Sequence, residues 1–305
     1  MLAGLSRAFG GAGAPPAAAS SSPASATFPD ASPSWAELSA LLAAAQAAAG
    51  VPTGAPDLEN GAPSPHAVRR LFGGTAPPRV LFYRDHASWC PYCEKVWLQL
   101  EEKRIPYEVR KINMRCYGDK PADFLAKVPS GLLPVIELDG KVYTESALIA
   151  SLLEREFPQH TPLLPPAVSA DAAAAEALMR LERQLFSRWL GWLTRRGGDA
   201  EGRAGVQACL AQVEAALGAR GGPYFLGESL SLVDITFAPF LERIAASLLY
   251  YKAFRVRGGG AFPRLDAWFA AMASRPTFAA IQSDYYTHAH DLPPQLGGER
   301  AGRAG

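Results

Sequence analysis

The stretch Trp89-Cys90-Pro91-Tyr92-Cys93-Glu94-Lys95-Val96, with two cysteines separated by two residues, decides the fold. A short apolar run, Arg79-Val80-Leu81-Phe82-Tyr83, precedes it, and an amphipathic pattern follows it through Leu100. This order predicts a strand that leads into a helix, with the first cysteine at the helix N-terminus. Unpaired N–H groups and the helix dipole favour a thiolate there, and Pro91 fits the first helical position. The motif therefore predicts thiol chemistry.

Length and composition limit the possible classes of protein. The chain has 305 residues, enough for two folded units and a tail, and an apolar fraction of 49% that can support a full core. The net charge of +1 gives no sign of a nucleic-acid or anionic-membrane surface. No apolar run approaches the roughly 20 residues of a membrane helix. From the charge and the missing apolar run together, we expect neither a nucleic-acid nor a membrane partner.

The use of cysteine points to a reducing compartment. Four cysteines are too few for a disulfide scaffold of this size. Zinc binding is the alternative interpretation of the motif, but it needs a second Cys or His pair at ligand spacing. Cys116 and Cys209 are isolated, and His288 and His290 are only two residues apart. We therefore expect no metal.

The first 78 residues form an extension before the regular pattern begins. Residues 1–33 are rich in Ala, Ser, Gly and Pro, which predicts either a transit peptide or a plain disordered tail. Ser34 and Glu37 have capping-box spacing and predict a short helix within an N-terminal extension over residues 34–78. Residues 50–78 collect Pro and Gly without a period and indicate an extended linker or wrap.

Residues 79–158 show an α/β pattern, and the chain beyond them is mostly helical. The expected order is β-α-β and then α-β-β-α, with Asp139-Gly140 as the turn of a hairpin. A linker over residues 159–171 leads to an all-helical domain over residues 172–285, and a Gly/Arg-rich tail over residues 286–305 is expected to be disordered. The predicted elements are strands 79–83, 107–113, 134–138 and 141–143, and helices 90–104, 121–128, 145–157, 172–196, 206–217, 235–251 and 262–272, with a turn at 277–281.

In this order of elements the chain resembles the glutathione transferase superfamily over about residues 79–285. The resemblance implies an α/β thioredoxin-like N-terminal domain joined to an all-α C-terminal domain. The two-cysteine motif is similar to the cysteine-type classes: omega, lambda, dehydroascorbate reductase and iota. The stretch 89–97, the following stretch Leu98 to Tyr107 and the N-terminal extension most resemble the iota class of photosynthetic organisms, which favours a chloroplast location, with the cytoplasm as the alternative.

The resemblance also implies a glutathione site. The segment 128–134 matches a family segment that ends in a cis-proline, here Pro134, which would turn the backbone of Leu133 toward glutathione. Glu145-Ser146 matches the acidic-Ser pair that binds the γ-glutamyl end at a helix N-terminus. Lys120 matches an omega-class lysine that reaches the glycyl carboxylate. Glutathione is thus the expected co-substrate.

Within this frame Cys90 is the expected nucleophile. It would attack a glutathione mixed disulfide or reduce a small oxidant such as dehydroascorbate, and glutathione would resolve the adduct by thiol–disulfide exchange. Cys93 is either the resolving cysteine or a structural one. Arg84 and His86 either activate the thiol or are solvated loop charges. Reduction is favoured over conjugation because Cys90 would itself form a disulfide with glutathione.

Several alternatives remain open from the sequence. The chain could be a conjugating glutathione transferase, a ligand-binding protein without turnover, or an iron–sulfur protein that uses Cys90 and glutathione across a dimer. A homodimer is possible in any of these. Phe186, Trp189 and Trp192 lie at helical spacing and indicate either core or, with Arg183, Tyr250 and Tyr251, a wall of a second-substrate pocket.

Overall fold

The computed structural model describes residues 34–48, 57–60, 65–114, 118–194, 198–283 and 288. The chain divides into two units, Met1–Ala55 and Pro56–Gly305. The predictions for residues 1–33, for Cys116 and, apart from His288, for the tail lie outside the described residues. In the first unit helix α1 (Trp35–Ala48) begins with the predicted capping box, since Ser34 N donates to Glu37 Oε2 (2.7 Å) and Glu37 N donates to Ser34 Oγ (3.3 Å).

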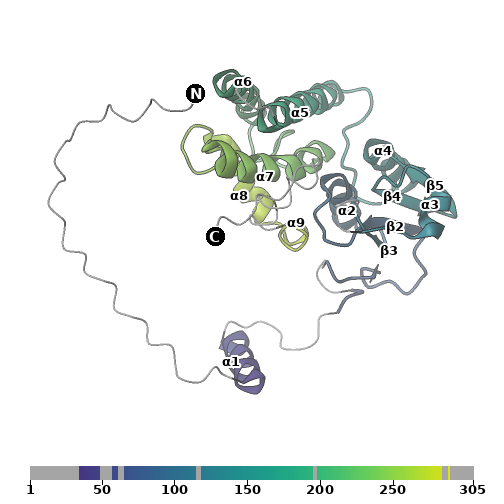
Figure 1. Ribbon diagram of the computed structural model, residues 1–305. Helices are drawn as coiled ribbons and strands as arrows, with labels where there is room; N and C mark the ends of the chain where they lie inside the picture. Colours follow the sequence, from purple (N-terminus) through teal and green to yellow (C-terminus); the bar gives the residue numbers. More distant parts are fainter. Residues whose placement is uncertain are drawn as a thin grey trace, which may run out of the picture. The chain divides into compact units, whose positions relative to one another are not determined.

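The second unit begins with an α/β domain around a mixed five-stranded sheet (Figure 1). The strand order is β1-β3-β2-β4-β5, and β2 and β3 run parallel while the other neighbours are antiparallel. The elements are β1 (Arg69–Arg70), β2 (Val80–Asp85), α2 (Pro91–Lys103), β3 (Tyr107–Ile112), α3 (Ala122–Lys127), β4 (Val135–Leu138), β5 (Lys141–Thr144) and α4 (Ser146–Glu156). The predicted thioredoxin-like order is therefore present, and the hairpin turn at Asp139-Gly140 has the positive φ angles that such a turn needs.

The segment before the expected first strand is part of this sheet. Arg69 and Arg70 pair with β3, and Val109 N donates to Val68 O (2.8 Å). Arg70 forms a buried ion pair with Glu101 at 2.9 Å. The linker or wrap that the sequence indicated thus contributes an edge strand. A two-residue strand of two arginines carries no alternation that could have predicted it.

The remaining helices form the C-terminal domain. They are α5 (Ala170–Thr194), α6 (Asp199–Leu217), α7 (Leu232–Lys252), α8 (Pro263–Ala273) and the short α9 (Pro276–Ala279). Helix α5 packs against α6 and α7, and α7 packs against α2 of the first domain. Helix α6 starts at Asp199, seven residues before the predicted Val206. The sequence did not predict this first part because Gly202 and Gly205 lower its helix propensity, but tertiary packing holds it in the helix.

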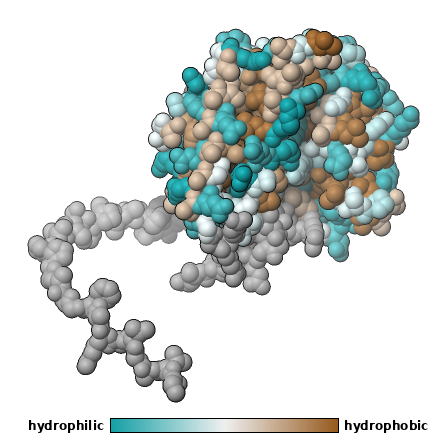
Figure 2. Space-filling model, turned by 90° about the horizontal axis from the view of Figure 1, so that it is seen from above, coloured by the Kyte–Doolittle hydropathy of each residue, from teal (hydrophilic) through white to brown (hydrophobic). Residues whose placement is uncertain are grey.

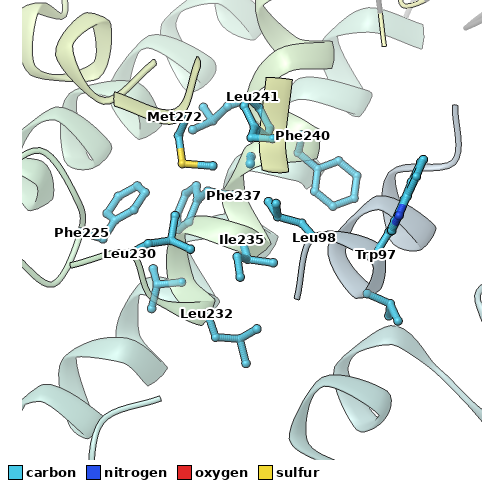
Figure 3. Close-up of a cluster of buried hydrophobic side chains, with 14 of the residues drawn as sticks. Trp97, Leu98, Phe225, Leu230, Leu232, Ile235, Phe237, Phe240, Leu241 and Met272 are labelled. Carbon is cyan, nitrogen blue, oxygen red and sulfur yellow. The ribbon is translucent and has the colours of Figure 1, made fainter. Parts of the chain in front are cut away.

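One hydrophobic core joins the two domains. Figure 3 shows Leu98 of α2 among side chains of α7, including Ile235 and Phe240. Leu98, Ile235 and Phe237 are fully buried. Helix α2, whose first turn carries the cysteine motif, is therefore packed against α7.

The outer surface of this unit is mixed in character. Figure 2 shows hydrophilic and hydrophobic residues interspersed over the face that is seen from above. Within the described residues no helix is both long and apolar enough to cross a membrane.

Candidate functional site

Cys90 is the N-cap of α2, as the sequence predicted. Its backbone is extended (φ −62°, ψ 115°), and its Sγ accepts a hydrogen bond from Cys93 N at 3.4 Å. Pro91 takes the first helical position. Cys90 Sγ thus accepts a hydrogen bond from an amide of the first turn that has no partner within the helix. The side chain is largely buried, with 7% of the residue exposed.

Cys93 lies one turn further into the helix and is almost fully buried. Burial raises the pKa of its thiol well above the ordinary value, and its side-chain hydrogen bond with Cys90 acts in the same direction. Cys93 therefore remains a thiol near neutral pH, with Cys90 Sγ beside it. The structure thus gives the two sulfurs of the motif different environments.

The end of β2 places the charged side chain of Arg84 next to the loop that leads into the cysteine motif. Arg84 is fully buried, stacks on Trp97 with its guanidinium carbon 4.2 Å from the ring centre, and donates to Ser88 Oγ (2.9 Å) and Pro65 O (2.6 Å). Burial lowers the pKa of this guanidinium. The interpretation of Arg84 as a solvated loop charge was therefore wrong, because β2 extends two residues beyond the predicted strand. His86 is exposed.

Asp85 is a site residue that the sequence did not single out. It is buried, and its Oδ2 accepts a hydrogen bond from Trp89 N at 2.6 Å, which shapes the loop before Cys90. One carboxylate oxygen of Asp85 and the sulfurs of Cys90 and Cys93 all lie within 4.8 Å of one another. These three groups could together offer three ligands to a metal ion, one fewer than a closed zinc site requires.

A second buried charge cluster approaches the motif from the C-terminal domain. Arg243 of α7 pairs with Glu94 of α2 at 3.0 Å and donates to Trp89 O. Glu94 and Glu242 are both buried, and burial raises the pKa of each, well above the ordinary value for Glu242. These two carboxyl groups therefore hold a proton more readily than an exposed glutamate does. Sequence reasoning missed Arg243, which lies 149 positions from Glu94 and shares no local spacing with it.

Beside the N-terminal turn of α2 lies a cavity of about 940 Å³. The predicted residues Leu133, Pro134, Glu145 and Ser146 all line it, and the Leu133–Pro134 peptide bond is cis, as predicted. Glu145 has φ +67°, an unfavourable conformation for a residue with a side chain, and it immediately precedes α4. The N-terminus of α4, with its free amides, therefore opens onto the cavity.

Lys120 is not among the residues that line the cavity. Its ammonium group donates to Asn113 O at 2.5 Å, and its aliphatic chain lies against Gly131. The cavity lining does not include the cysteines, although Tyr92 of the motif is part of it. The structure therefore brings four of the predicted glutathione contacts together and places Lys120 outside the lining.

The two tryptophans of the aromatic stripe belong to the core. Trp189 and Trp192 are buried, and their indole N–H groups donate to Ser247 Oγ (2.9 Å) and Asp199 Oδ1 (2.9 Å). Arg183 does line the cavity, whereas Tyr250 and Tyr251 do not. The pocket interpretation thus holds for Arg183 alone among these residues, since the stripe faces α6 and α7.

Lys95 is a further lining residue that the sequence did not single out. Its ammonium group pairs with Glu182 at 3.2 Å and lies 4.5 Å from the centre of the Phe240 ring. Burial lowers the pKa of Lys95 to about 8, against the opposing effect of Glu182. The cavity therefore contains a lysine that loses its charge close to physiological pH.

Comparison with known proteins agrees with this architecture. Residues 89–156 match the model of the family described as glutathione S-transferase, N-terminal domain, and residues 165–271 match glutathione S-transferase, C-terminal domain. Arabidopsis thaliana glutathione S-transferase DHAR2 is 30% identical over 167 residues, which cover 55% of this chain and 72% of that protein. Arabidopsis thaliana glutathione S-transferase DHAR3, chloroplastic, is 28% identical over 199 residues, covering 64% and 69%. The crystal structure of glutathione transferase Omega 3C from Trametes versicolor, 30% identical, has a TM-score of 0.60 and covers 68% and 91%.

Proposed function

Because the chain belongs to the glutathione S-transferase family, we propose that it is a glutathione-dependent thiol transferase or reductase whose nucleophile is Cys90. Its substrates would be glutathione mixed disulfides or small oxidants such as dehydroascorbate. The position of Cys90 carries this proposal, because Cys90 is the N-cap of α2 and its Sγ accepts a hydrogen bond from the amide of Cys93. A thiolate held in this way is a good nucleophile and a good leaving group in thiol–disulfide exchange.

The proposed reaction has two steps. The Cys90 thiolate attacks the glutathionyl sulfur of a mixed disulfide, so that a Cys90–glutathione disulfide forms and the substrate thiolate leaves. A second glutathione thiolate then attacks the glutathionyl sulfur of this adduct, which yields glutathione disulfide and restores Cys90. No other electron carrier is needed, because the glutathionyl group of the substrate and one free glutathione leave together as glutathione disulfide.

The cavity supports a place for glutathione beside Cys90. The backbone of Leu133 would pair with the cysteinyl part, and Ser146 with the amides of α4 would hold the γ-glutamyl carboxylate, which suits a helix N-terminus. Glu145 would hold the adjoining ammonium group. Lys120 would reach the glycyl carboxylate only after it releases Asn113 O.

Substrate turnover by matched variants tests the proposal. We expect Cys90→Ser to abolish glutathione-dependent reduction of a glutathione mixed disulfide. Ser146→Ala should raise the KM for glutathione about tenfold with little change in kcat, because it removes a ground-state contact. Conjugation of an electrophile to glutathione that survives in Cys90→Ser would contradict the proposal and favour a conjugating transferase. Glutathione binding without either reaction would favour a ligand-binding protein.

The cell compartment and the assembly are separate proposals. We propose a chloroplast location. The family resemblance favours it, and one relative carries the name glutathione S-transferase DHAR3, chloroplastic. A fluorescent fusion of the full chain found in the cytoplasm would refute it. We also propose that the chain forms a homodimer. Light scattering during gel filtration measures its mass, and the mass of a single copy would contradict this proposal.

A further inference from the structure

The environment of Cys93 raises the question of how this buried thiol could ever become a nucleophile. It has almost no contact with solvent, and its thiol lies beside Cys90 Sγ. While Cys90 is a thiolate, the Cys93 thiol is a hydrogen-bond donor to it. Once Cys90 carries a glutathionyl group it is no longer a charged acceptor, and Cys93 needs another partner for its proton.

Asp85 is the carboxylate that lies within reach. Its oxygen and the two sulfurs lie within 4.8 Å of one another, and all three residues are buried. We propose that Asp85 accepts the proton of Cys93 as Cys93 attacks the glutathionylated Cys90, which opens a dithiol route through an internal disulfide. This inference rests on the proposed function, since it needs the Cys90–glutathione adduct.

The step balances without a further reagent. The proton of Cys93 moves to the Asp85 carboxylate, a Cys93–Cys90 disulfide bond forms, and the bond between Cys90 and the glutathionyl sulfur breaks. Glutathione leaves as a thiolate and is protonated by Asp85 or by water. One disulfide replaces another, so nothing is oxidised or reduced overall, and two further glutathione molecules can reduce the internal disulfide.

The other charged groups around the motif have partners elsewhere. On β2 the Arg84 guanidinium bonds to the loop before Cys90 and to Pro65 O, and it also interacts electrostatically with Asp85 and Cys93. On α2 Glu94 is paired with Arg243 of α7, where Glu242 also lies. On β3 the Tyr107 hydroxyl donates to Glu101 Oε1 at 2.6 Å. Among the described His, Asp and Glu residues, Asp85 is the one grouped with both sulfurs.

Asp85→Asn separates proton transfer from structure. An asparagine oxygen can still accept the hydrogen bond from Trp89 N, so the loop keeps its anchor, but an amide cannot accept a proton from a thiol. The exposed Asp123 on α3 provides a matched control as Asp123→Asn. The full chain would be reduced, mixed with glutathione disulfide, quenched with a thiol-blocking reagent over time, and analysed by intact mass.

We expect the wild type and Asp123→Asn to pass from the glutathionyl adduct to the internal disulfide. In Asp85→Asn the adduct should form within about threefold of the wild-type rate, but its conversion should slow by at least about a hundredfold, the lower end of general-base effects. This conversion should also rise about tenfold per pH unit in Asp85→Asn, because hydroxide must then remove the proton, and much less steeply in the wild type. Cys93→Ser should stop at the adduct.

Each alternative outcome has a distinct meaning. Conversion in Asp85→Asn at the wild-type rate and with the wild-type pH profile would overturn the role of Asp85. A wild-type adduct that never converts would overturn the dithiol route while leaving the proposed function intact. No adduct on Cys90 in the wild type would overturn both. The wild-type pH profile is decisive by itself if Asp85→Asn does not fold, since a tenfold rise per pH unit would exclude an internal base.

Discussion

Arg243→Met would remove the guanidinium that joins the C-terminal domain to the cysteine motif. In the native protein this group pairs with Glu94, donates to Trp89 O, and donates to Pro239 O at 2.6 Å within its own helix. Methionine keeps part of the aliphatic stem but satisfies none of these acceptors. We therefore expect a loss of stability far beyond that of an ordinary surface substitution.

The size of the loss follows from the burial of the pair. The side chains of Arg243 and Glu94 are 1% and 2% exposed, so water cannot replace the missing guanidinium. Removing one partner of a buried ion pair costs about 3–5 kcal/mol, and we expect Arg243→Met to lower the free energy of unfolding by this amount. Burial already raises the pKa of Glu94, so the carboxyl can take up a proton as the pH falls. The loss should accordingly be largest at alkaline pH and shrink in acid.

Urea denaturation followed by tryptophan fluorescence measures the effect at several pH values. Arg155→Met is the control, because its pair with Glu156 is exposed and its loss should lie within experimental error. Adding Glu94→Gln to Arg243→Met should recover part of the stability at alkaline pH, since it removes the unpaired charge. A loss below about 1 kcal/mol at alkaline pH, or one independent of pH, would refute this account of the cluster.

Three further predictions concern other parts of the molecule. In α6, Gly202→Ala should destabilise by about 1–3 kcal/mol in urea denaturation because its Cβ would overlap Trp192, whereas Gly205→Ala, with 3.6 Å to its nearest neighbour, should stabilise by up to about 1 kcal/mol. Competitive acetylation analysed by peptide mass spectrometry should show Lys95 titrating near its pKa of about 8, and a midpoint near 10 would be a contradiction. Glu242→Gln should gain stability relative to the wild type as the pH rises above about 4.5, because burial raises the native pKa of Glu242 and folding then takes up a proton. Parallel stability curves for the two proteins between acid and neutral pH would rule this out.

The elements that local patterns predicted are those whose causes are local. The helix at the cysteine motif follows from the proline at its first position and from apolar residues at 3.6-residue spacing, and Val96, Trp97 and Leu100 are buried as expected. The hairpin at Asp139-Gly140 follows from two residues that tolerate positive φ. The cavity residues Glu145 and Ser146 were found through the order of family motifs, not through any local signal.

What the sequence could not reveal depends on contacts between distant segments. Arg243 and Glu94 lie 149 positions apart, and Ser283 Oγ donates to Ser88 O (3.1 Å) across 195 positions. Neither contact has a spacing that a pattern could register. Trp189 shows the same limit from the other side. An aromatic residue at helical spacing indicates burial, but the neighbour that buries it, and so the choice between core and pocket that the sequence left open, is set by tertiary packing.

These long-range contacts give the C-terminal domain a second role beside forming a cavity wall. The loop before Cys90 is held at Trp89 N by Asp85 from the sheet, at Trp89 O by Arg243 from α7, and at Ser88 O by Ser283 after α9. Directional polar bonds from three separate elements fix the backbone more closely than apolar packing alone, because each has a narrow range of angles. The N-cap geometry of Cys90 depends on this backbone. We therefore propose that the helical domain positions Cys90, the proposed nucleophile, as well as forming a wall of the cavity.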